Sequence, residues 1–162
     1  MAYSLARIGM EAEAEVRRTR AEVSEAAFLA EGSLPEAENR KDFFVERNGL
    51  RFAGTHLILD LWEAERLDDP AYMEAVLREC VAVAGATLLH IHVHAFIPNG
   101  GLSGVVVLAE SHISVHTWPE RGYAAFDIFM CGAANPHAAI PVLRRAFRPG
   151  RLTVTEQLRG VF

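Results

Sequence analysis

Alternating apolar and polar residues recur in short segments over most of the chain, and this period of two constrains the fold more than any other feature. In the segment THLILDLW, Leu57, Leu59 and Leu61 lie two positions apart, which predicts a strand with one buried face. Strands are likewise expected at 87–96, 103–110, 111–118, 123–130 and 151–158.

Two other segments show the helical period instead. Pro70 opens the first, apolar residues follow at helical spacing, and Gly85 ends it. Asn135 and Pro136 open the second, which runs to Phe147. The order β-α-β-β-β-β-α-β predicts an α+β fold, a two-layer sandwich whose mostly antiparallel sheet has helices packed on one face.

Residues 1–48 differ from the rest because they are rich in charge and poor in β-branched residues. We expect a mobile, charged N-terminal extension there, with a surface helix over 10–30 whose Ala and Glu residues favour helix. A partner-binding helix is the alternative. Residues 49–162 are expected to form one domain.

Composition excludes several classes of function. The formal net charge is -5 and no run of basic residues stands out, so no nucleic acid is expected as a partner. No apolar run is long enough to span a bilayer, and the start lacks the order of a secretory signal, so we expect a cytoplasmic protein without a membrane partner. The two cysteines fit no zinc motif, and Cys80 is expected to be a small buried apolar residue.

Residues 108–132 concentrate the side chains that can do chemistry. Ser111, His116 and Cys131 occur there within a short span of expected strands and turns, together with Glu110. Serine beside histidine and cysteine suggests nucleophilic chemistry. On residue types alone this signal is weak, since serines and histidines on a sheet are usually polar surface.

The stretch ESHISVHTWPE, residues 110–120, resembles the signature around the processing site of prokaryotic S-adenosylmethionine decarboxylase proenzymes, which are pyruvoyl-dependent. The resemblance continues forward through GYAAFDIFMCG and backward through FIPNGGLSGVVVLAE. It covers roughly residues 50–158 and carries several specific residues in fixed order.

The resemblance implies that the chain breaks itself between Glu110 and Ser111. The Ser111 hydroxyl would attack the Glu110 carbonyl to form an ester, and elimination followed by hydrolysis would leave a pyruvoyl group, derived from Ser111, capping residues 111–162. Residues 1–110 would form the other chain. The new carbonyl would bind a substrate amine and accept electrons as carbon dioxide leaves.

The resemblance also implies roles for other residues. His116 matches the histidine that promotes elimination, Ser103 matches the serine that assists processing, and Cys131 matches the cysteine that reprotonates the substrate α-carbon. Glu120 matches the acid that holds ribose hydroxyls. Phe96 matches an aromatic residue that stacks on adenine, if one extra glycine near residue 100 is allowed for.

Strand spacing places some of these residues relative to one another. Ser111 and His116 are five residues apart, about 16 Å in an extended chain, and on opposite faces. If 111–118 and 123–131 fold back about residue 121, Ser111 lies opposite Cys131. If the chain reverses near Glu110, Ser103 lies opposite His116.

These distances lead to a hypothesis about assembly. Ser111 and Cys131 would come from one subunit, and Ser103 and His116 from its symmetric partner. Two equivalent sites would then lie at the interface of a homodimer.

His90, His92 and His94 alternate along one expected strand and so share a face. Three imidazoles suggest zinc, but side chains from one strand diverge and no supporting carboxylate is evident. We favour a polar or dimer surface, and expect no metal. No role is assigned to Asp127.

Three classes of function follow, namely a pyruvoyl-dependent decarboxylase, a binding protein, and a metal-dependent protein built on His90, His92 and His94. The leading one is decarboxylation of S-adenosylmethionine to the aminopropyl donor for spermidine synthesis. The alternatives are a pyruvoyl-dependent arginine or ornithine decarboxylase, and a binding paralogue that never cleaves. Glu120 favours a ribose-bearing substrate because a carboxylate accepts hydrogen bonds from a diol.

Overall fold

The computed structural model of the protein describes residues 43–98 and 100–162. The helix predicted over 10–30, and most of the predicted extension 1–48, lie outside the described residues. Within the described part, no helix is long and apolar enough to cross a membrane.

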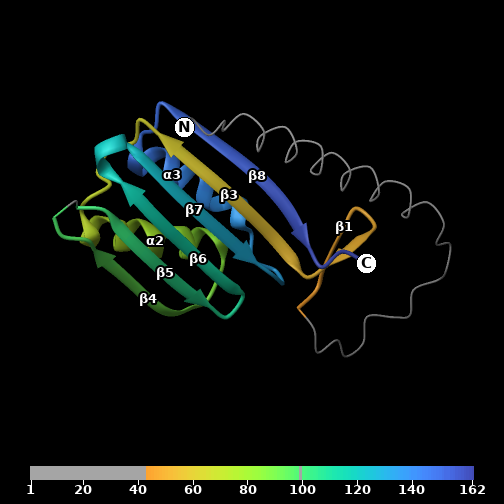
Figure 1. The fold of residues 1–162 in the computed structure, drawn as a ribbon. Coiled ribbons are helices and arrows are strands. Elements are labelled where there is room, and N and C mark those ends of the chain that lie inside the picture. Colours follow the sequence, from red (N-terminus) through yellow and green to blue (C-terminus); the bar gives the residue numbers. More distant parts are fainter. Residues whose placement is uncertain (1–42, 99) are drawn as a thin grey trace, which may run out of the picture. The chain divides into compact units, whose positions relative to one another are not determined.

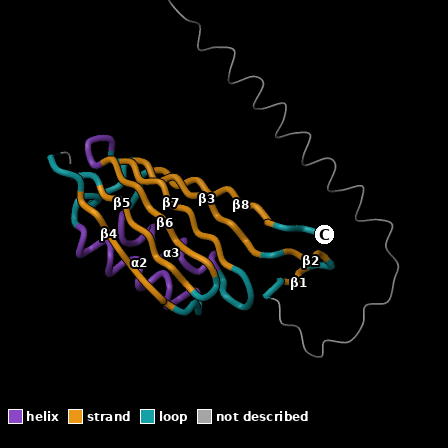
Figure 2. The backbone as a smooth tube through the Cα atoms, turned by 60° about the horizontal axis from the view of Figure 1, so that its bottom comes forward, coloured by secondary structure: helices purple, strands orange, loops and turns teal. Residues whose placement is uncertain are grey.

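Six antiparallel strands of the described chain form one sheet in the order β4-β5-β6-β7-β3-β8 (Figure 1). Their bounds are Gly54–Trp62 for β3, Leu88–Ala95 for β4, Leu102–Leu108 for β5, Ser111–Trp118 for β6, Tyr123–Met130 for β7 and Arg151–Arg159 for β8. Helices α2 (Pro70–Ala84) and α3 (Ala139–Phe147) lie on the same side of this sheet (Figure 2). The predicted two-layer α+β sandwich is confirmed.

Helix α2 begins and ends where the sequence predicts. The Asp69 side chain accepts a hydrogen bond from the Tyr72 N–H at 3.0 Å, and Pro70 occupies the first turn, where its missing N–H costs nothing. Gly85 ends the helix with a φ of 68°, a conformation that glycine adopts without steric cost.

The second helix starts differently from the prediction. Asn135 does cap it, accepting from the His137 N–H at 3.1 Å, but the first turn is the 3-10 helix η2 (Pro136–Ala138), and α3 follows it. Pro141 has no N–H to donate to the carbonyl four residues earlier, so α-helical pairing cannot run through this first turn.

The two faces of the sheet differ sharply in character. Leu57, Leu59 and Leu61 are fully buried against the helices, as predicted, and Phe126 packs on Phe147 of α3 with ring centroids 5.8 Å apart. Cys80 is also buried, which raises the pKa of its thiol to about 12. The opposite face, here called the open face, carries the polar and aromatic side chains considered below.

A short hairpin precedes the sheet and was not predicted. Strand β1 (Val45–Arg47) pairs with β2 (Leu50–Phe52) through a turn at Asn48 and Gly49, both with positive φ. Asn-Gly is the preferred pair for such a turn and was the available signal. The predicted boundary between residues 48 and 49 falls inside this hairpin.

Candidate active site

The bond predicted to break lies in the tight hairpin between β5 and β6. Leu108 pairs with Ser111, so Ala109 and Glu110 form a two-residue turn. Ser111 has a φ of 128°, which residues with a Cβ rarely adopt. Such a conformation costs on the order of 1–3 kcal/mol and persists only where the surroundings enforce it. Backbone strain therefore lies on the residue expected to become the carbonyl group.

Glu110 is held through both its main chain and its side chain. The Cys131 N–H donates to the Glu110 carbonyl oxygen at 2.9 Å. The Thr87 N–H donates to Glu110 Oε2 at 2.8 Å, and the Thr87 hydroxyl donates to Oε1 at 3.1 Å. The Thr87 N–H is the main cause that lowers the pKa of the Glu110 carboxyl. The carbonyl that Ser111 would attack thus has a donor on its oxygen, as a developing oxyanion requires.

The register expected for Cys131 is wrong by one residue. Ser111 pairs with Met130, not with Cys131, and the Cys131 N–H bonds instead to the carbonyl of Glu110. The loop of η1 (Pro119–Arg121) and Gly122 has four residues, so the two strands fold about a point between residues 120 and 121. Cys131 nevertheless lies against the bond predicted to break.

Ser103 and His116 are opposed across β5 and β6, and this prediction is confirmed. Ser103 Oγ lies 3.3 Å from His116 Nε2 on the open face. A serine hydroxyl in hydrogen-bond reach of an imidazole can exchange a proton with it, which is the property that both predicted roles need.

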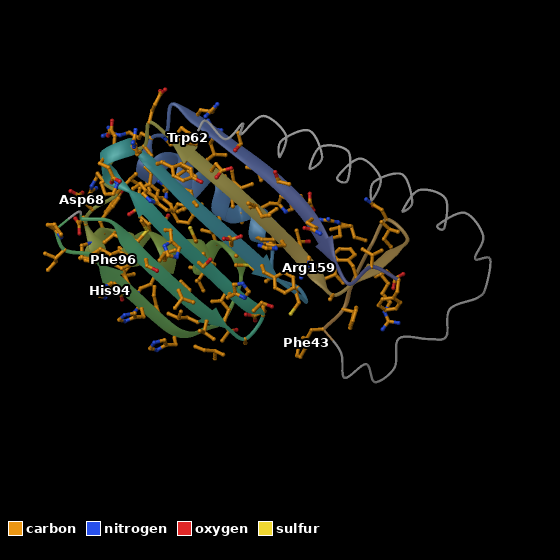
Figure 3. All side chains as sticks on the ribbon, viewed as in Figure 1. Phe43, Trp62, Asp68, His94, Phe96 and Arg159 are labelled. Atoms are coloured by element: carbon orange, nitrogen blue, oxygen red, sulfur yellow. The ribbon has the colours of Figure 1, made fainter. Side chains whose placement is uncertain are left out.

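A cavity of about 180 Å³ opens beside this pair. It is lined by Phe96, Gly101, Leu102, His116, Thr117, Trp118 and Glu120. Phe96 follows β4 and packs on His94 with ring centroids 4.9 Å apart (Figure 3). The structure therefore gathers Phe96, His116 and Glu120, three residues singled out from the sequence, around one hollow. Their roles stay predictions.

An aromatic stack supports the Trp118 wall of the cavity. Trp118 stacks on Tyr123 at 5.2 Å between centroids, and Tyr123 stacks on Trp62 at 4.3 Å. The Tyr123 hydroxyl donates to Asp60 Oδ1 at 2.6 Å, and this bond is the largest cause that raises the pKa of Tyr123 to about 12. Sequence reasoning missed Tyr123 and Asp60, because only the register of β3 against β7 brings them together.

A further group of polar side chains lies on the open face around Asp127. Asp127 Oδ1 is 3.1 Å from His56 Nε2, and Asp127 Oδ2 accepts from the Ser114 hydroxyl at 3.4 Å. Ser114 lies in the middle of β6. Neither Asp127 nor His56 received a role from the sequence, and these contacts make them part of the open face that flanks the site.

His90, His92 and His94 are exposed on β4, opposite Val107, Val105 and Ser103. Across residues 43–98 and 100–162, the His, Cys, Asp and Glu side chains form no group of three or more that could hold a metal ion.

The candidate site thus has two parts at opposite ends of β6. The turn end comprises Thr87, Glu110, Ser111 and Cys131, and the hollow end comprises Phe96, Ser103, His116, Trp118 and Glu120. Within one chain the five residues from Ser111 to His116 separate the two ends by about 16 Å.

Comparisons with known proteins agree on one family. The family model for S-adenosylmethionine decarboxylase matches residues 55–160. An S-adenosylmethionine decarboxylase proenzyme from Thermomicrobium roseum is 46% identical over 113 residues, covering 69% of this chain and 97% of its own length. One from Methanococcus aeolicus is 46% identical over 114 residues, covering 68% and 97%.

A solved structure is similar as well. The adenosylmethionine decarboxylase of Aquifex aeolicus matches with a TM-score of 0.58 and 33% identity, covering 67% of this chain and 92% of that one. The fold and these comparisons thus define a self-processing decarboxylase proenzyme. The chain belongs to the S-adenosylmethionine decarboxylase family.

Proposed function

We propose that this protein cleaves itself between Glu110 and Ser111 and then decarboxylates S-adenosylmethionine with a pyruvoyl group derived from Ser111. The product would be the aminopropyl donor for spermidine synthesis. Family membership supports the reaction. The observation that carries the assignment to this bond is the strained Ser111 beside a Glu110 carbonyl that already accepts the Cys131 N–H. The cytoplasmic location stays a prediction.

Cleavage proceeds in steps that this geometry suits. The Ser111 Oγ–C bond to Glu110 forms, the C–N bond between the two residues breaks, and the hydroxyl proton passes to the freed nitrogen. Loss of the Ser111 α-proton to His116 then expels the Glu110 carboxylate. Water hydrolyses the resulting dehydroalanine and releases ammonia. Ser103, in contact with His116, assists this proton transfer.

The pyruvoyl carbonyl supplies an electron sink for the bond to the departing carboxyl group. Cys131 holds at its sulfur the proton that replaces that group on the substrate. Glu120 accepts hydrogen bonds from the ribose hydroxyls, and Phe96 stacks on the adenine. The cavity shared by Glu120, Phe96 and His116 supports this assignment.

A homodimer completes the site in this proposal. Ser111 and His116 are too far apart in one chain for proton transfer, which needs about 3 Å. A two-fold axis near Ser114, in the middle of β6, would bring the turn end of one chain to the hollow end on the open face of the other. Exposed Val105 and Val107 on this face support its burial against a second copy.

Intact mass tests the cleavage directly. The parent protein should yield two fragments, 1–110 and 111–162, and Ser111→Ala should remain one chain with an unchanged melting temperature. Phenylhydrazine, which traps carbonyl groups, should abolish activity. An unbroken, trapping-resistant parent would overturn the proposal.

Release of labelled carbon dioxide tests the substrate. S-adenosylmethionine should release it, whereas arginine and ornithine should not. Release from either amino acid would favour the alternative decarboxylase, and a chain that neither cleaves nor releases carbon dioxide would favour the binding paralogue.

A further inference from the structure

Thr87 makes more contacts to the hairpin turn than any role assigned so far explains. It lies in the connection between α2 and β4. Its carbonyl oxygen accepts from the Ala109 N–H at 3.0 Å, while its own N–H and hydroxyl donate to the two carboxylate oxygens of Glu110 at 2.8 and 3.1 Å. Three hydrogen bonds from one residue thus fix both residues of the turn.

The local register leaves Thr87 free to make these contacts. The pairing of β4 with β5 runs from Ala95 to His90, and then shifts before Leu88 meets Leu108. Beyond this irregularity, the N–H of Thr87 is directed at a side chain instead of a strand carbonyl. Glu110 is therefore hydrogen bonded at both ends. Thr87 donates to its carboxylate, and the Cys131 N–H donates to its carbonyl oxygen.

We propose that Thr87 is a positioning residue for self-cleavage, which clamps the Glu110 side chain so that the Glu110 carbonyl carbon stays within reach of Ser111 Oγ. This inference rests on the proposed function. Attack needs the hydroxyl oxygen near 3 Å from the carbonyl carbon, and a loose turn would lose that geometry. The φ of 128° at Ser111 also persists only if both neighbours are held.

The acidity of Glu110 agrees with this arrangement. Hydrogen bonds that favour the charged form lower a carboxyl pKa, and the pKa of Glu110 is lowered, chiefly by the Thr87 N–H. The clamp is therefore a charge-assisted contact, which is stronger than one between neutral groups.

The rate at which fresh full-length protein divides into its two fragments tests the clamp. Thr87→Val removes the hydroxyl donor and should slow division about tenfold. Thr87→Ser keeps that donor and should remain within about twofold of the parent. Thr153→Val is the matched control, since it also removes a threonine hydroxyl that donates to a carboxylate, that of Asp60 at 3.4 Å, but remote from the turn. It should leave the rate unchanged.

A double-mutant cycle shows whether the effect passes through this contact. Glu110→Ala should slow division more than Thr87→Val, because it removes both acceptors. The double variant should be no slower than Glu110→Ala alone. Independent, multiplying effects would overturn the proposal.

Hydroxylamine separates ester formation from the elimination that follows it, because it cleaves an ester directly. Thr87→Val should stay slow in hydroxylamine, since the clamp acts on formation of the ester. Recovery of the parent rate would overturn the proposal. A parent that never divides refutes the proposed function, whereas a parent and Thr87→Val that divide equally fast refute only the role of Thr87.

Discussion

The two ends of β6 are built in opposite ways. At the turn end, a two-residue turn is hydrogen bonded to Thr87 and Cys131, and Ser111 has a strained backbone. At the hollow end, Ser103 and His116 meet only at 3.3 Å beside an open cavity. A tightly held, strained peptide suits a reaction that the chain performs once on itself. An open hollow suits a small molecule that must enter and leave repeatedly.

The largest expected effect tests whether the two ends belong to different chains. Cys131→Ser alters only the turn end, and His116→Ala alters only the hollow end. Each variant alone should be inactive. Coexpression should restore about a quarter of the parent activity, because half of randomly formed dimers are mixed and each mixed dimer has one intact site of two.

Mass spectrometry provides the control for this experiment. In mixed dimers, the chain with His116→Ala has an intact turn end facing an intact partner histidine, so this chain should divide. It should remain whole when expressed alone. No recovery of activity on mixing would mean that both ends act within one protomer. Division of the His116→Ala chain when expressed alone would instead mean that self-cleavage does not need His116.

Glu120→Gln should weaken the hollow end without disturbing the turn end. A hydrogen bond to a charged group contributes about 1.5–3 kcal/mol, so KM for S-adenosylmethionine should rise about 10–100-fold. The rate of self-cleavage should not change. Impaired cleavage with an unchanged KM would mean that Glu120 acts in self-cleavage and not in substrate binding.

Tyr123→Phe should have a smaller effect through the cavity wall. It removes the hydrogen bond to Asp60 but leaves the ring stacked between Trp62 and Trp118. This hydrogen bond does not contact the substrate and only orients the ring that supports Trp118, so KM should rise a few-fold while kcat stays constant. A fall in kcat alone would indicate that Tyr123 contacts the reacting atoms.

The smallest effect concerns acid stability at the turn end. The folded-state pKa of Glu110 is lowered, so its clamp stabilises the fold above the ordinary carboxyl pKa and is lost as pH falls through the lowered value. The double variant Ser111→Ala/Thr87→Val should therefore be less stable near neutral pH than Ser111→Ala alone, and neither protein is cleaved. The difference in unfolding free energy should vanish in strong acid, and a difference that grows in acid would contradict the clamp.

The sequence predicted the sheet and helices well because each element repeats its apolar residues at regular spacing over its whole length, as at Leu57, Leu59 and Leu61. It also predicted the contact of Ser103 with His116, since a two-residue turn leaves one register. It failed by one residue for Cys131, where loop length alone decides the pairing. Thr87 was out of reach because its contact with Glu110 spans 23 residues and depends on an irregularity in β4.

The strand order decides how the two pieces of the chain would stay together after the proposed cleavage. Residues 1–110 contribute β3, β4 and β5 to the sheet, while residues 111–162 contribute β6, β7 and β8. In the order β4-β5-β6-β7-β3-β8, the two polypeptides interleave, meeting at β5 with β6, at β7 with β3 and at β3 with β8. Neither piece could leave without dismantling the sheet, so the proposed cleavage would sever the backbone and keep all six strands paired.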